Sequence, residues 1–201
     1  MAVRDALLGI LLIGPAYGFQ LHGELAARTG GRRTINVGQT YGTLDRLAAR
    51  ALIEPAGATD DGLPLHRLTE AGRVEALAWL HGTDASVSDP WDETVDRVLL
   101  SASLPGVELA PILAGERRRW AERLEAAGAV SGEASVADEA SPPGEAAVLA
   151  RHAAAIDRAR AGALIDWLDS IAAAPPPAFG FADTRPKRGR RRSTPAQPAS
   201  A

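Results

Sequence analysis

The stretch that decides the fold reads Ile35-Asn36-Val37-Gly38-Gln39-Thr40-Tyr41-Gly42-Thr43-Leu44-Asp45-Arg46-Leu47-Ala48-Ala49-Arg50-Ala51-Leu52. Large side chains recur there at steps of three and four residues, which predicts a helix whose buried face is formed by Val37, Tyr41, Leu44 and Leu47. The opposite face then carries short hydrogen-bonding side chains and one guanidinium: Asn36, Gln39, Thr40, Thr43 and Arg46. Side chains of these types can read base edges in a DNA major groove, whereas a merely solvated face usually carries pairs of Lys and Glu.

Two shorter helices are predicted upstream, over residues 3–13 and 19–28, because leucines recur on one side of each. Gly14-Pro15 ends the first helix, and Gly30-Gly31 ends the second. Asn36 is expected to cap the third helix, since its short side chain can accept a hydrogen bond from a backbone N–H group of the first turn.

Downstream of Leu52 the pattern changes from helix to hairpin. Residues 52–55 and 65–68 have the pattern of short strands, and the Asp61-Gly62 pair between them is typical of a hairpin turn. Thr69 is expected to cap a fourth helix over residues 70–80. Three helices, a two-stranded ribbon and a further helix predict a winged helix-turn-helix domain over residues 1–82.

The rest of the chain is predicted to be α-helical with one interruption, so the fold class is mainly α. The predicted segments are a helical region (83–127), a flexible linker rich in Gly, Ala, Ser and Pro (128–144), a last helix (145–173) and a disordered tail (174–201). Apolar residues of the last helix are predicted to form one buried stripe: Leu149, Ala153, Ile156, Ala163, Leu164, Trp167 and Ile171.

The net charge of −3 hides a marked asymmetry along the chain. Residues 1–80 carry eight basic and eight acidic side chains, residues 81–182 eight basic and sixteen acidic. Residues 183–201 carry six basic side chains and one acidic. The average charge therefore gives no support for nucleic-acid binding, although the basic tail could add contacts to phosphates that are independent of base sequence.

Several function classes are excluded or disfavoured by composition. The chain has no Cys, so disulfides, thiolate nucleophiles and Cys-ligated metals are excluded. Its four histidines are scattered, and no sequence motif of a catalytic or phosphate-binding site is present, so we expect no enzyme activity, metal or cofactor. The longest apolar run, residues 6–13, is too short to span a bilayer, so we expect a cytoplasmic protein.

Four segments resemble the PadR family of bacterial transcriptional regulators: Ala6-Leu7-Leu8-Gly9, Gly14-Pro15-Ala16-Tyr17-Gly18-Phe19-Gln20-Leu21, Val37 to Leu47, and Arg67-Leu68-Thr69-Glu70-Ala71-Gly72-Arg73. They occur in the family's order and with its spacing. Two departures are apparent: Gly42 stands where the family often has proline, and Arg32-Arg33-Thr34-Ile35 replaces a tryptophan-containing segment.

The resemblance implies a homodimer that binds an operator in double-stranded DNA. The helical region after the winged domain forms the dimer interface in that family, and related proteins sense phenolic acids or hydrophobic drugs. Trp91 and Trp120 are therefore our candidates for a site that takes a small aromatic or hydrophobic effector. Both could equally be anchors of the core or of the dimer interface.

The candidate base-reading residues are Gln39, Thr40 and Thr43, Gln by pairing with adenine and Thr by contact with thymine methyl groups. Asn36 at the helix start and Arg46 two turns further on are expected to contact phosphates. Tyr41 belongs to the predicted apolar seam, with its hydroxyl reaching outward, so both core packing and DNA contact stay open for it.

The remaining DNA-binding candidates lie outside this helix. Tyr17 and Gln20 open the second helix and could brace a phosphate, with core packing as the alternative for Tyr17. His66 and Arg67 lie on the wing and could contact phosphate or the minor groove; Arg67 could instead pair with Asp60 or Asp61.

The sequence thus predicts a sequence-specific, ligand-responsive, homodimeric repressor. One alternative is a helical interaction module whose winged domain binds a protein, which the acidic middle of the chain motivates. A nucleoid-type binder without base preference is a third hypothesis, and it predicts steep salt dependence without an operator.

Overall fold

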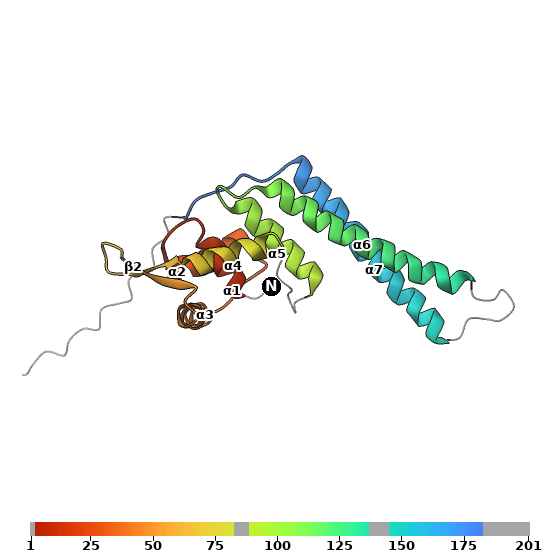
Figure 1. Ribbon diagram of the computed structural model, residues 1–201, viewed down its shortest axis with the longest axis horizontal. Coiled ribbons are helices and arrows are strands. Elements are labelled where there is room, and N and C mark those ends of the chain that lie inside the picture. The colour runs from red at the N-terminus through yellow and green to blue at the C-terminus, as the bar shows by residue number, and fades with distance from the viewer. Residues whose placement is uncertain (1–2, 83–88, 137–144, 183–201) are drawn as a thin grey trace, which may run out of the picture.

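The computed structural model describes residues 3–82, 89–136 and 145–182 (Figure 1). In these ranges the elements are α1 (Val3–Ile10), β1 (Ala16–Tyr17), α2 (Gly18–Arg28), α3 (Val37–Ala49), β2 (Ile53–Ala58), β3 (Pro64–Leu68), α4 (Glu70–Leu80), α5 (Pro90–Ser103), α6 (Leu109–Val136) and α7 (Glu145–Ala173). The protein is mainly helical, and its N-terminal part is a winged helix-turn-helix domain, as predicted.

The wing is part of a three-stranded antiparallel sheet with the order β1-β3-β2. β2 and β3 are the predicted ribbon, and Glu54 lies opposite Arg67 in its register. β1 was not predicted, because two residues are too few to produce a strand pattern. It pairs Ala16 with His66 and Tyr17 with Leu65, so it joins the start of α2 to the wing.

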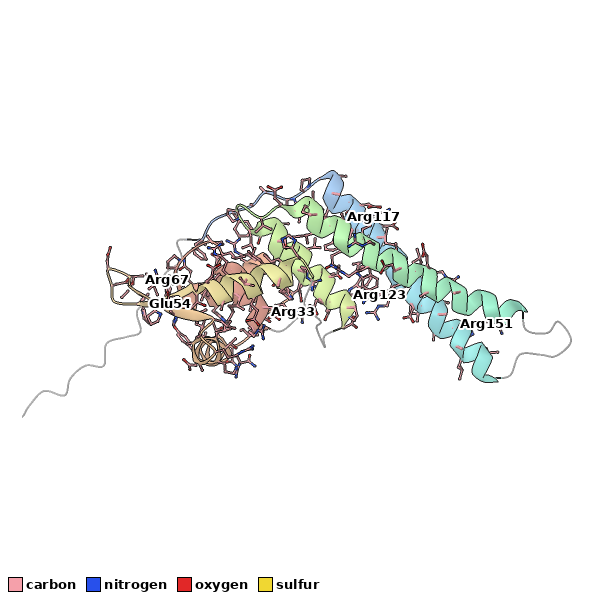
Figure 2. All side chains as sticks on the ribbon, viewed as in Figure 1. Arg33, Glu54, Arg67, Arg117, Arg123 and Arg151 are labelled. Atoms are coloured by element: carbon pink, nitrogen blue, oxygen red, sulfur yellow. The ribbon has the colours of Figure 1, made fainter. Side chains whose placement is uncertain are left out.

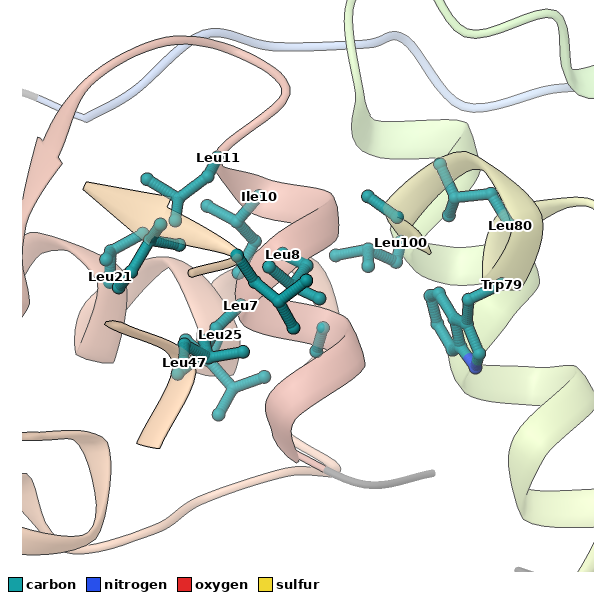
Figure 3. Close-up of a cluster of buried hydrophobic side chains, with 14 of the residues drawn as sticks. Leu7, Leu8, Ile10, Leu11, Leu21, Leu25, Leu47, Trp79, Leu80 and Leu100 are labelled. Carbon is teal, nitrogen blue, oxygen red and sulfur yellow. The ribbon is translucent and has the colours of Figure 1, made fainter. Parts of the chain in front are cut away.

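The core of the winged domain surrounds α1, whose residues 6–10 are all buried. Leucines from α2 and α3 contact α1 on one side, and Trp79, Leu80 and Leu100 contact it on the other (Figure 3). Leu100 belongs to α5, and Leu104 and Ile112 are in the same cluster, so this core extends past residue 82. The helix α5 is therefore packed as part of the winged domain.

A buried network of charged groups joins α4, α5 and α6. The Arg97 guanidinium donates to the Trp79 carbonyl (2.7 Å) and to Glu93 (2.9 Å), and it also pairs with Glu116. The Trp79 indole N–H donates to Glu93 at 3.1 Å. Burial raises the pKa of Glu116, but hydrogen bonds and charges from Arg119 and Arg97 outweigh it and keep the pKa below its ordinary value. The carboxylate therefore stays ionised inside the protein.

α6 and α7 form a long antiparallel hairpin that projects away from the winged domain (Figure 1). A second core joins it to α5 through Val95, Val98, Leu113, Trp120, Ala161, Leu164 and Leu168. α6 continues past residue 127 to Val136, so residues 128–136, expected in the linker, are helical.

The buried stripe of α7 differs from the predicted one. The buried residues of α7 are Ala154, Ala161, Leu164 and Leu168. The two alanines are small, and small buried residues let neighbouring helices approach closely. Trp167 and Ile171 are partly buried. The other predicted members point to solvent: Leu149 is 70% and Ile156 59% exposed, and Ala153 and Ala163 are also exposed.

The chain after α7 also differs from the prediction. Residues 174–182 were expected to belong to a disordered tail, but they form an extended strap that returns from the end of α7 to the winged domain (Figure 1). The strap ends against α2, where the Ala182 backbone N–H donates to Glu24 at 2.8 Å. The basic residues 185–192 lie outside the described part of the chain.

Within the described ranges, no helix is both long enough and apolar enough to cross a bilayer.

Candidate nucleic-acid interface

The helix α3, predicted to be the recognition helix, begins with a reciprocal capping box. The Asn36 side chain accepts from the Gln39 backbone N–H at 2.8 Å, and the Gln39 side chain accepts from the Asn36 backbone N–H at 3.0 Å. The predicted cap at Asn36 is confirmed. Because the side-chain oxygen of Gln39 is engaged, its amide NH2 is the part of that side chain that remains available to a ligand.

The face that α3 turns outward is rotated from the predicted one. Thr40 and Thr43 are 0% and 5% exposed and line the buried side with Leu44 and Leu47. Thr40 lies 3.3 Å from the His22 ring, and the Thr43 hydroxyl donates to the Gln39 carbonyl at 2.8 Å. The prediction that both threonines read bases is therefore wrong, because their side chains are packed inside the domain.

Val37 and Tyr41, predicted as part of the buried seam, are instead 38% and 43% exposed. On the outward side of α3 they join Asn36, Gln39, Asp45 and Arg46. Successive residues of a helix are 100° apart around its axis. Gln39 and Arg46 therefore lie along one edge of the outward face, Tyr41 lies along the other edge, and Gly38 and Gly42 lie between the two edges. Nothing lies within 4 Å of a Cβ built at Gly42, so this centre is flat and open.

Tyr41 is held in place by the start of α2. A Cβ at Gly18 would lie 2.6 Å from the Tyr41 ring, so only glycine lets the ring rest there. Tyr17 is 8% exposed, and this burial favours the core-packing alternative over a phosphate contact. Gln20 is partly exposed, on the first turn of α2.

On the wing, the two candidate DNA-binding residues, His66 and Arg67, are less available as cations than predicted. The Arg67 guanidinium donates to Glu54 at 2.8 Å across the two strands (Figure 2), so its partner is neither Asp60 nor Asp61. His66 is half-buried; burial lowers the pKa of its imidazole, and the nearby Asp45 carboxylate opposes this shift only in part. At the tip, Asp61 accepts from the Thr59 hydroxyl at 2.6 Å.

A cationic hollow of about 300 Å³ lies between the start of α1 and the second half of α3. It is lined by Val3, Arg4, Thr43, Arg46, Leu47 and Arg50. Glu75 of α4 pairs with Arg4 and lies 3.7 Å from Arg50, while Arg46 donates to the Thr43 hydroxyl at 2.9 Å. Sequence reasoning missed Arg4 and Arg50, because only the fold brings α1 beside α3.

The loop before α3 is attached to α5. Arg32 donates to Asp92 at 2.9 Å, and Arg33 donates to Asp96 at 2.7 Å. The hydrogen bond and charge of Asp96 raise the pKa of Arg33. The partners of these two arginines are therefore acidic groups of α5.

The two candidate effector residues lie together. The Trp91 and Trp120 rings meet edge to face with centroids 6.1 Å apart. Trp120 lines a hollow of about 310 Å³ with Asp89, Pro90, Arg123, Ala127, Asp157 and Arg160. Arg160 pairs with Asp89 at 3.1 Å, and Arg123 lies 4.7 Å from the Trp120 ring centroid.

Comparison with known proteins gives a family match and several structural similarities. Crystal structures of Bacillus subtilis PadR are similar to this chain: the operator DNA complex (19% identity, 85% of this chain, 96% of that chain, TM-score 0.36) and the p-coumaric acid complex (20%, 86%, 98%, 0.36). The structure of smu.1604c from Streptococcus mutans UA159 is similar at 20% identity, over 86% of this chain and 99% of that chain, with a TM-score of 0.35. These values are too low to establish a shared activity.

None of the curated proteins matches the chain. Residues 7–78 match the Transcriptional regulator PadR-like family, whose members are regulators and not enzymes. This range contains α1, α2, α3, the wing and most of α4. The family match therefore covers residues 7–78 of the 201-residue chain, the winged helix-turn-helix part.

Proposed function

We propose that this regulator is a cytoplasmic, homodimeric repressor that binds operator DNA through α3 and releases it when an aromatic acid binds near Trp120. The observation that carries the DNA-binding part is the outward face of α3. Hydrogen-bonding side chains flank two glycines there, so a duplex can approach the helix backbone closely.

Base contacts are assigned to Gln39, Tyr41 and Asp45. The Gln39 NH2 can donate to a purine N7 or to a thymine O4 without breaking the capping box, and Asp45 can accept from a cytosine amino group. Asp45 replaces Thr40 and Thr43 among the assigned base contacts, because the two threonine side chains are buried and Asp45 is exposed. Tyr41 offers its ring edge to a thymine methyl group.

Phosphate contacts are assigned to the two sides of α3. The hollow lined by Arg4, Arg46 and Arg50 has the charge and size for one backbone phosphate, with Glu75 holding two of the guanidinium groups in the absence of DNA. Asn36 and Gln20 are assigned to phosphate contacts beside the opposite end of α3. His66 and Arg67 can contact the backbone from the wing, with Arg67 exchanging Glu54 for a phosphate.

The α6–α7 hairpin is the proposed dimerisation surface. Leu149 and Ile156 are exposed on α7, and an apolar hollow of about 330 Å³ lies near the other end of the hairpin, lined in part by Leu109, Leu113, Leu168 and Pro175. A second copy packed against this surface would remove these groups from water. Such a dimer would place two α3 helices about one helical turn of DNA, about 34 Å, apart.

The hollow beside Trp120 is the proposed effector site. Its volume suits a small aromatic molecule, the 5% exposed Trp120 forms part of its apolar wall, and Arg123 and Arg160 can bind a carboxylate. An acid bound by Arg160 would compete with Asp89, the N-cap of α5. Because Asp92 and Asp96 of α5 hold the loop before α3, a shift of α5 would move the recognition helix.

Selection of bound sequences from a random duplex pool tests the DNA-binding part. Enrichment of a two-fold symmetric site is expected, and Gln39→Ala with Asp45→Ala should abolish its preference without unfolding the protein. Arg73→Ala, an exposed change on α4, is the matched control. A pool that stays unenriched, with binding that depends only on salt, would indicate a nucleoid-type binder instead.

Fluorescence of the tryptophans tests the effector part. Titration with an aromatic acid should change the emission, whereas its methyl ester should bind at least tenfold more weakly because it lacks the charge that pairs with arginine. Arg160→Met should remove the difference between acid and ester. Light scattering of the purified protein measures the oligomeric state, and a strict monomer would contradict the proposal.

A further inference from the structure

A buried ion pair on α2 holds the backbone of the C-terminal strap. Arg28 and Glu24 are one helical turn apart, pair at 2.7 Å, and are 2% and 4% exposed. The Arg28 Nη2 donates to the carbonyls of Phe179 and Gly180, each at 2.9 Å. The second carboxylate oxygen of Glu24 accepts from the Ala182 N–H at 2.8 Å.

The end of α5 completes the same arrangement. The Ser103 carbonyl accepts from Arg28 Nη1 at 2.7 Å and from the Phe179 N–H at 3.1 Å. The Ser103 hydroxyl lies 3.2 Å from the same Arg28 nitrogen. α2, α5 and the strap therefore meet around one guanidinium, and each of its three nitrogens has a partner.

Two aromatic side chains accompany these hydrogen bonds. The Phe179 ring lies over the Arg28 guanidinium with a distance of 4.2 Å from Cζ to the ring centroid. Phe181 packs against the core of the winged domain. The strap thus carries two of the chain's three phenylalanines, whereas a solvated tail is usually poor in aromatic residues.

Without the strap, this ion pair would be incomplete. Arg28 Nη2 would lose both of its acceptors, and one oxygen of Glu24 would lose its donor. Burial already lowers the pKa of Arg28, opposed by the charge of Glu24, so the environment disfavours an unpaired cation. A buried charge with an unmet hydrogen bond is costly, and α2 is therefore built to receive a peptide backbone.

We propose that Glu24, Arg28 and Ser103 form a binding site for an extended peptide, and that its ligand is residues 179–182 of the same chain. This latch is a second anchor between the winged domain and the hairpin. The first anchor is the packing of α5 and the start of α6 in the N-terminal core. The hairpin is then attached to the winged domain both at the start of α6 and after the end of α7. These two attachments hold the winged domain in one orientation relative to the hairpin.

The occupant is argued from chain continuity. Only residues 174–178 separate the end of α7 from Phe179, and five extended residues span at most about 18 Å. The strap is therefore always near its site, at an effective concentration in the range of millimolar or above. The exchanged strap of a second copy is the alternative occupant, and the experiment below separates the two.

Hydrogen exchange of the full chain tests the latch directly. In the wild type, the N–H groups of Phe179 and Ala182 should be protected, and the double variant Phe179→Ala/Phe181→Ala should lose about tenfold to hundredfold of that protection. Pro176→Ala, an exposed change in the same strap, is the matched control and should keep it. Wild-type strap N–H groups that exchange at the rate of an unstructured peptide would overturn the proposal.

A variant of the receptor side distinguishes loss of the latch from loss of the fold. Glu24→Gln/Arg28→Met removes both charges together, so neither is left unpaired in the core. It should release the strap while the N–H groups of α1 keep their wild-type protection. Retained strap protection in this variant would also overturn the proposal, because the ion pair would not be the receptor.

Spin labels establish which copy supplies the strap. The chain has no native cysteine, so Ala27→Cys on α2 and Ala178→Cys on the strap give a clean label pair at exposed positions. Diluted tenfold with unlabelled protein, a labelled chain should show one narrow distance distribution, and Phe179→Ala/Phe181→Ala should broaden it. A short distance that disappears on dilution would assign the strap to the partner copy and overturn the proposal. None of these measurements requires DNA, so the latch can fail or hold independently of the proposed DNA binding.

Discussion

Arg33 and Asp96 join the loop before α3 to α5, with Arg33 Nη2 2.6 Å from Asp96 Oδ2. Asp96 is fully buried, and Arg33 is only partly exposed. The position of α3 is therefore set by the helix whose N-cap Asp89 and first-turn Trp91 lie at the proposed effector site. This connection gives the first prediction.

Asp96→Asn should weaken operator binding about tenfold and lower the free energy of unfolding by about 1–3 kcal/mol, because Arg33 loses a charged partner. Asp92→Asn is the matched control on the same helix face; its carboxylate is 44% exposed, so its loss should cost less than about 1 kcal/mol. Urea unfolding and DNA titration measure the two effects. Equal effects of the two changes would contradict the assigned role of Asp96.

Gly72→Ala should destabilise the protein by about 1–3 kcal/mol or more. A Cβ at this position would lie 1.9 Å from the Leu52 carbonyl oxygen, and backbone cannot move aside as a flexible side chain can. The same contact explains a glycine in the Arg67–Arg73 segment that resembles the family. Thermal unfolding measures the change, and an unchanged midpoint would show that α4 is free to shift away from Leu52.

Gly42→Ala should act in opposite directions on stability and on DNA binding. The new methyl group meets open space within a helix, so the free energy of unfolding should rise by about 0.5–1 kcal/mol. Because Gly42 lies at the centre of the face assigned to the major groove, operator affinity should fall. Increased affinity together with increased stability would place the DNA elsewhere.

Arg50→Ala should reduce the slope of log K against log salt for DNA binding by about 0.9, the value for one phosphate contact. Glu75→Gln should raise DNA affinity, because it frees Arg4 and Arg50 from a competing carboxylate. Arg73→Ala, an exposed change on α4, is the control and should leave the slope unchanged. Binding isotherms at several salt concentrations give all three slopes.

His66 predicts a pH dependence of folding. Burial puts the folded-state pKa of its imidazole below the ordinary value of 6.5, so the unfolded chain binds the proton more tightly. The associated stability is present above pH 6.5 and is lost as the pH falls through the region between that value and the lower folded pKa. His66→Gln should flatten this part of the stability curve, measured by urea unfolding from pH 5 to 8; an unchanged slope would assign it to other groups.

Local rules predicted most of the elements and their ends. Asn36 and Thr69 each cap a helix as expected, because the cap depends only on a short polar side chain and the three residues that follow. The α4 and α7 helices have the predicted bounds, and the hairpin forms around Asp61-Gly62. The four segments that resemble the family also placed the winged domain correctly.

The sequence by itself therefore determined the order of the elements and the winged helix-turn-helix domain, with the family resemblance of residues 7–78. Only the tertiary structure decided which side of α3 faces outward, since Tyr41 rests on Gly18 and two threonines fill the core; helical spacing alone does not distinguish a buried Thr from an exposed Tyr. The hollow between Arg4 and Arg50 and the docking of residues 179–182 on Arg28 also arose from tertiary contacts. In each case the partners are far apart in sequence, and no local pattern encodes a contact whose free energy appears only after the chain has folded.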